Sequence, residues 1–237
     1  MFPIRAKRKL AITPYATYIL IAINVLVFVW ELSLGTGLSG TFRDIALVPC
    51  QVGVDLNTIL DSFRTMFLHA SWVHLIGNML FLLVFGPHLE QFMGQAWFVA
   101  FYLVAGQAAN FAHTLSNLGQ CAVPGIGGYV PVVGASGAVF GLLGGFLLLY
   151  PATRIQMMAL FLRLPVGFVD VRAFVMLVYM FLFDFIDALT SLGADTVTTR
   201  GVAVWAHVGG FAAGLLLAFL FTAFVRPLPT LDEGLED

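Results

Sequence analysis

The sequence predicts an all-α polytopic membrane protein, with six membrane-spanning helices and a long loop between the first two. Of its 237 residues, 60% are hydrophobic and only 10% are charged, and the mean hydropathy is +0.95. A soluble domain carries about 25% charged residues, so this chain has too few polar side chains to cover a globule in water. Its apolar residues also fall into six runs, which approach the roughly 17–25 residues that a membrane-crossing helix needs.

The first predicted span covers residues 15–32. It follows a basic segment, residues 1–14, and the two together imitate a signal peptide. The apolar run is long, however, and no small-residue cleavage site follows it, so we expect a retained span. The connection over residues 33–71 is too polar to cross a membrane. Within it, residues 54–67 mix apolar and charged side chains, which is typical of an interfacial helix.

Five further spans complete one predicted membrane domain. The loop over residues 116–133 is rich in Gly and Pro yet apolar, and we expect it to dip into the protein, because non-helical backbone at membrane depth needs shielding. Residues 226–237 form an acidic tail that we expect to be disordered. The domain as a whole covers residues 15–225, and its later spans are expected at residues 71–86 with an extension towards 94, 95–115, 135–150, 173–189 and 202–225.

Basic residues in the loops predict the orientation, because Lys and Arg accumulate on the cytoplasmic side of a membrane. Of the 11 such residues, only Arg43, Arg64 and Arg200 fall on the side opposite the N-terminus. Both termini are therefore expected to be cytoplasmic, with the protein surrounded by lipid in the cell (plasma or inner) membrane. Ser136 then lies near the outer end of the fourth span, and the long loop lies on the outer side.

Several functions lack support in the sequence. No basic stripe with interleaved aromatic residues suggests nucleic-acid binding, and there is no HExxH motif of a zinc protease. His69, His74 and His207 have no carboxylate or thiolate at ligand spacing, so we expect neither a metal site nor a cofactor. Cys50 and Cys121 both fall on the predicted outer side, where a disulfide can form in an oxidising compartment. The sequence leaves open whether they pair.

The segment GASGAVFG, residues 134–141, opens the fourth span and has two interpretations. In one, Gly137 and Gly141 let another helix approach closely. In the other, Ser136 is a nucleophile whose own N–H, free at a helix start, binds an oxyanion. The segment alone favours helix packing, and the balance changes only when partners for the serine are found elsewhere.

His207 in the sixth span is the candidate partner of the serine. Gly210 and Gly214 follow it at i+3 and i+7, on its own helical face. The fourth and sixth spans thus carry matching small-residue stripes, and Ser136 and His207 lie at a similar depth. Packing of these helices would join a nucleophile to a general base, the minimum for acyl transfer. The alternative is a buried histidine that bonds a neighbouring carbonyl group.

His74 and Asn78 lie four residues apart in the second span, so both side chains occupy one helical face near the outer edge. Neither suits a surface in contact with lipid, and we expect this face to look inward. An imidazole and an amide there could bind the oxyanion of a tetrahedral intermediate. The alternative is an interhelical hydrogen bond without a catalytic role.

These three motifs together resemble those of the rhomboid intramembrane serine proteases. Residues 134–141 match GxSGxxxG, residues 74–78 match HxxxN, and residues 206–214 match AHxxGxxxG, in the family's order and on the corresponding spans. The likeness covers residues 60–225. The chain departs from the family at one place. Many members have a Trp-Arg pair in the first outer loop, and this chain has Leu60-Asp61 at the aligned positions.

The resemblance implies a six-helix bundle and a Ser136–His207 dyad with no acidic third member. It further implies oxyanion contacts from His74, Asn78 and the Ser136 N–H, and packing of Phe140 against the imidazole. Glu90 matches a structural position, and Asp184 resembles a family acid whose role the sequence does not give; that of Asp187 is equally open. The implied activity is endopeptidase cleavage in or near the transmembrane segments of other proteins. The rival is a non-enzymatic membrane protein, such as a transporter or a chaperone for membrane helices.

Overall fold

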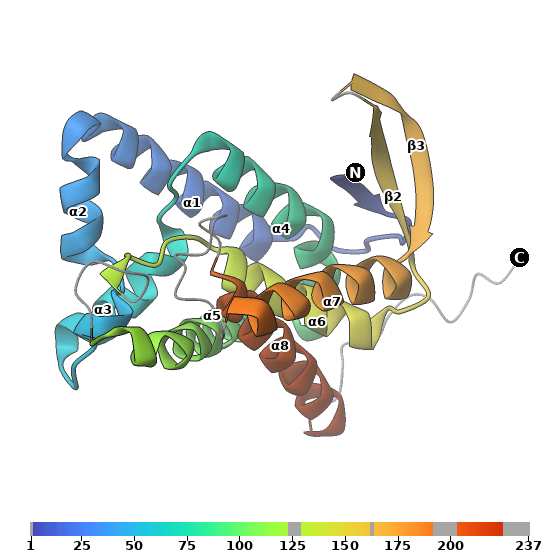
Figure 1. Ribbon diagram of the computed structural model, residues 1–237. Coiled ribbons are helices and arrows are strands. Elements are labelled where there is room, and N and C mark those ends of the chain that lie inside the picture. The colour runs from blue at the N-terminus through green and yellow to red at the C-terminus, as the bar shows by residue number, and fades with distance from the viewer. Residues whose placement is uncertain (1, 123–128, 162–163, 192–202, 225–237) are drawn as a thin grey trace, which may run out of the picture.

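The computed structural model describes residues 2–122, 129–161, 164–191 and 203–224 (Figure 1). Most of these residues are helical, as the sequence predicts. The elements, in chain order, are β1 (Phe2–Ala6), α1 (Tyr15–Ser33), η1 (Gly35–Gly37), α2 (Leu38–Ile45), η2 (Pro49–Gln51), α3 (Leu56–Arg64), η3 (Thr65–Phe67), α4 (Trp72–Met93), α5 (Gln95–Asn117), η4 (Leu118–Gln120), α6 (Ser136–Leu149), β2 (Arg154–Phe161), β3 (Leu164–Arg172), α7 (Ala173–Ser191) and α8 (Val204–Phe224).

Six of these helices, α1 and α4 to α8, fall on the six apolar runs. Within the described residues, α1, α4, α7 and α8 are long and apolar enough to cross a membrane, whereas α6 is a shorter apolar helix. The turn from α4 to α5 is tight and depends on Gly94, whose φ of 81° lies in the left-handed region that favours glycine. The loop between α1 and α4 holds α2 and α3, and α3 lies inside the segment expected to form an interfacial helix.

Glu90 holds the start of α1 against α4. The first amides of a helix lack partners within the helix and attract negative charge. Here the Glu90 carboxylate accepts bonds from the backbone N–H of Ala16 at 2.9 Å and of Thr17 at 2.8 Å, and from the Thr17 hydroxyl at 2.7 Å. This carboxylate is fully buried. A charged residue inside an apolar helix is thus explained by the cap that it provides.

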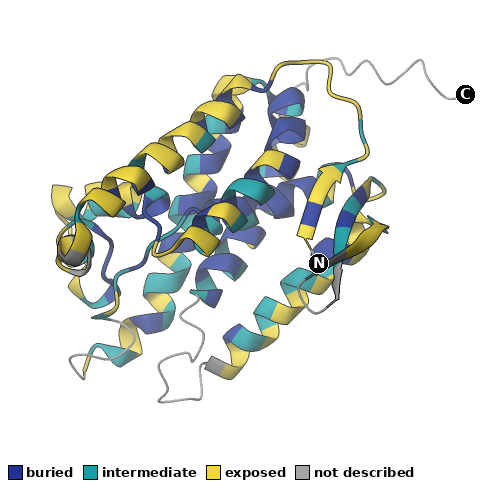
Figure 2. Cartoon of the chain, turned by 90° about the horizontal axis from the view of Figure 1, so that it is seen from above, coloured by how far each residue is buried: buried dark blue, intermediate teal, exposed yellow. Residues whose placement is uncertain are grey.

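The centre of the molecule is α6, which packs against α4, α5, α7 and α8. Its glycines allow a very close approach to α8: a Cβ on Gly210 would lie 2.1 Å from the carbonyl oxygen of Gly137, and one on Gly214 would lie 1.9 Å from that of Gly141. Backbones can meet at this distance only where no side chain intervenes. Figure 2 shows buried residues gathered on the inward faces of the helices, with exposed residues on the outer faces.

A three-stranded antiparallel sheet, in the order β1-β2-β3, was not predicted and corrects the all-α expectation. It stands at the opposite end of the molecule from α2 and α3 (Figure 1). The N-terminal strand pairs with β2, with Phe2 opposite Met158 and Ala6 opposite Ile155. Lys7 then forms an ion pair with Asp170 of β3 at 2.5 Å. The basic N-terminal segment and the connection between α6 and α7 therefore lie together.

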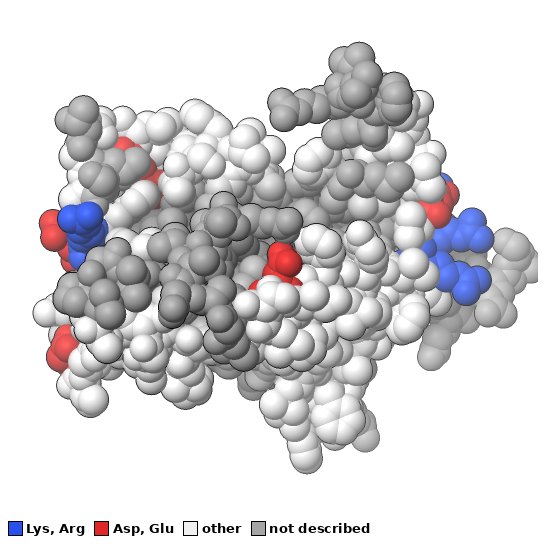
Figure 3. Space-filling view, in the orientation of Figure 1, with Lys and Arg blue, Asp and Glu red and all other residues white. Residues whose placement is uncertain are grey.

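The surface suits a lipid environment. Large apolar side chains face outward along α1, α7 and α8, among them Leu26, Tyr179 and Phe224, which are 68%, 69% and 82% exposed. Apolar surface on this scale marks an interaction with a membrane or a partner. On the face drawn in Figure 3, charged side chains gather at the two ends of the molecule, with one small acidic patch between them.

Candidate active site

Ser136 is the first residue of α6 and is half-buried. The chain reaches it through Gly134, whose φ of 130° favours glycine. A Cβ on Gly134 would lie 2.5 Å from Cε1 and 2.7 Å from Nε2 of His74, so the imidazole of His74 rests directly on this glycine. Because Gly134 precedes Ser136 by two residues, this contact places His74 at the N-terminal end of α6, where the first backbone N–H groups of the helix lack partners within the helix.

Thr65 fixes the segment that leads into Ser136. Its hydroxyl donates to the carbonyl oxygen of Val132 at 2.7 Å and accepts from the N–H of Leu47 at 2.8 Å, and its own carbonyl oxygen accepts from the N–H of Gly134 at 2.9 Å. The N–H of Val132 also donates to Leu47 at 2.8 Å. Thr65 is fully buried. It was not singled out from the sequence, because nothing local marks one threonine of an irregular loop as a junction.

His207 on α8 stacks on Phe140, which lies one helical turn after Ser136 on α6. The ring of Phe140 stacks on the imidazole, with centroids 3.9 Å apart and planes 7° from parallel. Phe140 follows Ser136 by four residues on α6, so the two share a face. Next to the serine, a Cβ on Gly137 would lie 3.7 Å from the carbonyl oxygen of Ala206, the residue before the histidine. Among the described residues, no hydrogen bond joins Ser136 to His207. Catalytic hydrogen bonds are often looser before substrate binds.

Asp184 on α7 contacts the same imidazole. Its Oδ2 lies 2.8 Å from Nδ1 of His207. The family resemblance implied a pair without an acidic third member, and the sequence had singled out Asp184 without a role. Asp184 and His207 are 23 residues apart in the chain and lie on different helices. Only the packing of α7 on α8 therefore reveals the contact.

Asn78 on α4 is buried and bonded to His69, with its amide nitrogen 3.0 Å from Nε2 of that ring. Nδ1 of His69 lies 3.2 Å from the carbonyl oxygen of Phe67. We assign the proton of His69 to Nδ1, which donates to Phe67, so that Nε2 accepts from Asn78. The Asn78 amide keeps a second N–H. Within the described residues, Asn78 makes no hydrogen bond to Ser136.

His69 is itself held by the end of α1, since its backbone N–H donates to the Glu31 carboxylate at 3.0 and 3.2 Å. Burial, and to a smaller extent the neighbouring His74, lower the pKa of His69 to about 4, although the bond to Phe67 acts in the opposite direction. The ring therefore stays neutral at physiological pH. The rings of His69 and His74 lie 5.2 Å apart.

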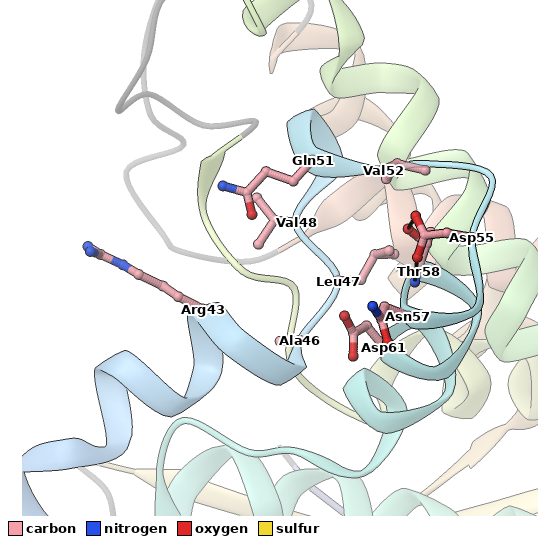
Figure 4. Close-up of a pocket in the computed structure, with 10 residues that line it drawn as sticks. All are labelled: Arg43, Ala46, Leu47, Val48, Gln51, Val52, Asp55, Asn57, Thr58 and Asp61. Atoms are coloured by element: carbon pink, nitrogen blue, oxygen red, sulfur yellow. Dashed lines mark hydrogen bonds between the residues drawn. The ribbon is translucent and has the colours of Figure 1, made fainter.

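Figure 4 shows a pocket elsewhere, in the long loop between α1 and α4. Its lining extends from the end of α2 to α3 and includes Asp55 and Asp61, but neither Ser136 nor His207. It is therefore separate from the candidate active site. In the part of the chain that the structure describes, no group of three or more His, Cys, Asp or Glu side chains could hold a metal ion.

The loops that cover this end of the bundle are joined covalently. Cys50 in η2 and Cys121, which follows η4, form a disulfide between residues 71 positions apart in the chain. The hydroxyl of Tyr129 donates to the carbonyl oxygen of Cys121 at 3.1 Å. The pairing that the sequence left open is thus present in the structure.

Comparison with known proteins places this geometry in context. The family model described as "Rhomboid domain" matches residues 57–224. The chain is 33% identical over 163 residues to RHOMBOID-like protein 4 of Arabidopsis thaliana, covering 68% of this chain and 33% of that protein. It is 30% identical over 154 residues to YdcA of Bacillus subtilis (strain 168), provisionally named a rhomboid protease, covering 65% and 62%. Rhomboid protein 1, mitochondrial, of Saccharomyces cerevisiae is 31% identical over 140 residues, covering 58% and 37%. The chain spans less than two thirds of each relative.

Proposed function

The chain belongs to the rhomboid family, and we propose that it is an intramembrane serine endopeptidase acting through Ser136 and His207. Its substrates are other membrane proteins, cut in or near their transmembrane segments. The observation that carries this proposal is the imidazole of His207, stacked on Phe140 one turn from Ser136. The family and the apolar helices make the chain an integral membrane protein.

The reaction is acyl transfer by a nucleophile and a general base. Ser136 Oγ attacks the scissile carbonyl carbon while Nε2 of His207 accepts the hydroxyl proton. The oxyanion is bound by the backbone N–H of Ser136, by His74 and by the second N–H of Asn78. His207 returns its proton to the leaving amine. Water then attacks the acyl-enzyme, again with His207 as the base.

The length of α6 sets the depth of this chemistry. With 14 residues, it is about 21 Å long, whereas the hydrocarbon core is about 30 Å thick. We propose that α1 and α4 to α8 all cross the membrane, with both termini in the cytoplasm of a cell bounded by this plasma or inner membrane. Ser136 then lies below the outer surface, in a water-accessible cavity. A substrate helix must unwind locally there, which helix-breaking residues make easier.

Cleavage of a single-span substrate in proteoliposomes tests the proposal. Ser136→Ala and His207→Ala should each abolish cleavage, and a fluorophosphonate probe should label the wild type but not Ser136→Ala. Ser116→Ala is the matched control, because its hydroxyl makes only local bonds near the end of α5: it donates to the carbonyl oxygen of His113 at 2.8 Å and accepts from the side-chain amide of Asn117 at 3.2 Å. Cleavage by either site variant at the wild-type rate would show that the Ser136–His207 assignment is wrong. A wild type that the probe does not label in native lipid would favour a non-enzymatic membrane protein.

A further inference from the structure

We propose that Asp184 is a positioning residue for the catalytic base: it orients the imidazole of His207 and stabilises its protonated form, without itself taking a proton. This inference rests on the proposed protease function. It starts from the 2.8 Å contact between Oδ2 of Asp184 and Nδ1 of His207. Both side chains are largely shielded, with 20% of Asp184 and 11% of His207 exposed. A charge-assisted hydrogen bond in such surroundings is stronger than one in water.

The contact determines which ring nitrogen is free. A carboxylate only accepts hydrogen bonds, so its partner Nδ1 carries the proton, and the lone pair of the neutral ring is on Nε2. That is the tautomer which can take a proton from Ser136. In the reaction, the proton moves from Ser136 Oγ to Nε2 and later to the leaving amine, while the carboxylate stays ionised and stabilises the imidazolium.

Two contacts together fix the ring. Phe140 covers one face of the imidazole in a nearly parallel stack, and Asp184 holds one edge. The stack restricts the tilt of the ring plane, and the hydrogen bond restricts rotation within that plane. Neither contact occupies Nε2. The base is therefore held in place before substrate arrives, which lowers the entropic cost of the proton transfer.

The other ionisable groups near His207 act in the opposite sense. His74 on α4 and His113 on α5 both interact electrostatically with it, and a positive charge on either would disfavour the imidazolium. The sequence of α6, which packs along α8, contains no titratable side chain. On α7, Asp187 is the other carboxylate. Asp184, bonded directly to the ring, is thus the group that supports the charged state of the base.

Steady-state cleavage in proteoliposomes tests this role with Asp184→Asn, which preserves the size of the side chain and removes its charge. We expect kcat to fall by about 100-fold or more, with a much smaller change in KM. Asp184→Glu should restore part of kcat, and Asp187→Asn should remain within about two-fold of wild type.

A second measurement needs no variant of Asp184. In 15N-histidine-labelled wild type, with the His207 signals assigned by their loss in His207→Gln, NMR should find the proton of the neutral ring on Nδ1. A proton on Nε2 would overturn the proposal, as would an Asp184→Asn variant with the kcat of the wild type. In either case Ser136 would still react with a fluorophosphonate, so the protease function itself would stand. Failure of the proposed function would show instead as a wild type that the fluorophosphonate does not label, or as cleavage that survives in Ser136→Ala.

Discussion

At the residue scale, His69 shows how a titratable group can be kept out of the chemistry and still support it. Its neutral ring is bonded on both sides, to Phe67 through Nδ1 and to Asn78 through Nε2. A protonated ring would have to donate at both nitrogens, and Nε2 would then face an amide N–H that also donates. Protonation of His69 therefore breaks the contact that orients Asn78.

This makes the fold sensitive to acid. The unfolded chain protonates His69 near pH 6.5, whereas the folded chain resists until about pH 4. Stability from this residue is complete above pH 6.5 and falls as the pH drops towards 4, because the unfolded state then binds more protons. The loss amounts to at most about 3 kcal/mol. Thermal unfolding in detergent from pH 7.5 to 4.5 measures it.

The variant His69→Gln separates this effect from that of the other histidines. It lacks the titrating ring, so its Tm should depend less on pH than that of the wild type across the same range. An identical dependence of Tm on pH in the two proteins would show that the pKa of His69 is the same in the folded and the unfolded state.

At the element scale, the contact between α6 and α8 determines whether serine and imidazole meet. We expect Gly214→Ala to lower the free energy of unfolding by more than about 3 kcal/mol, since its Cβ would overlap the backbone of Gly141 and the helices would have to separate. Gly77→Ala in α4 is the control: apart from its chain neighbours and the adjoining backbone of α4, no atom lies within 4 Å of its added Cβ, so helix propensity should stabilise the protein by about 0.5–1 kcal/mol. Denaturation in mild detergent checks both. A Gly214→Ala variant with an unchanged free energy of unfolding would mean that α6 and α8 are not in contact at this position.

The loop element before Ser136 gives a second prediction at this scale. Thr65→Val keeps the shape of the side chain but removes the hydroxyl bonded to Leu47 and Val132, so it should cost about 1–3 kcal/mol of stability. It should also lower kcat by displacing Gly134. Thr222→Val, which removes an exposed bond to the carbonyl oxygen of Phe219, should change neither quantity. Equal Tm and kcat for wild type and Thr65→Val would contradict the junction role.

The sequence predicted elements better than contacts. Helices α1 and α4 to α8 were predicted to within a few residues, because each coincides with an apolar run in the sequence. The pairing of β2 with β3 was missed, since arginines at 154, 163 and 172 marked that segment as a simple connection. Thr65 and Asp184 were missed as partners for another reason: both act across long chain separations, where the rotation and packing of helices decide which side chains touch.

At the scale of the whole molecule, the Cys50–Cys121 disulfide joins the long loop to the end of α5. Closing a loop of this length stabilises a fold by about 4 kcal/mol in the chain-entropy account. We expect dithiothreitol to lower the Tm of the wild type, because the unfolded chain gains freedom. The double variant Cys50→Ser/Cys121→Ser should melt at the reduced wild-type temperature with or without reductant. A wild type indifferent to dithiothreitol would show that the bridge is absent or does not contribute.

The placement of Asp184 also divides the proposed catalytic residues between two parts of the helix bundle. Ser136, Phe140 and His207 belong to α6 and α8, whose backbones are in close contact. Asp184 belongs to α7, which packs on α8 through side chains such as Phe181, whose ring stacks on that of Phe211 with centroids 4.5 Å apart. A sideways swing of α7 that admitted a guest helix would leave the nucleophile beside an unsupported base. Hydrolysis would then begin only after α7 had returned to its position against α8, so this closing movement, and not the entry of the substrate helix, would set the rate of cleavage. A covalent cross-link between α7 and α8 should accordingly leave the hydrolysis of small soluble esters unchanged and block the cleavage of transmembrane helices.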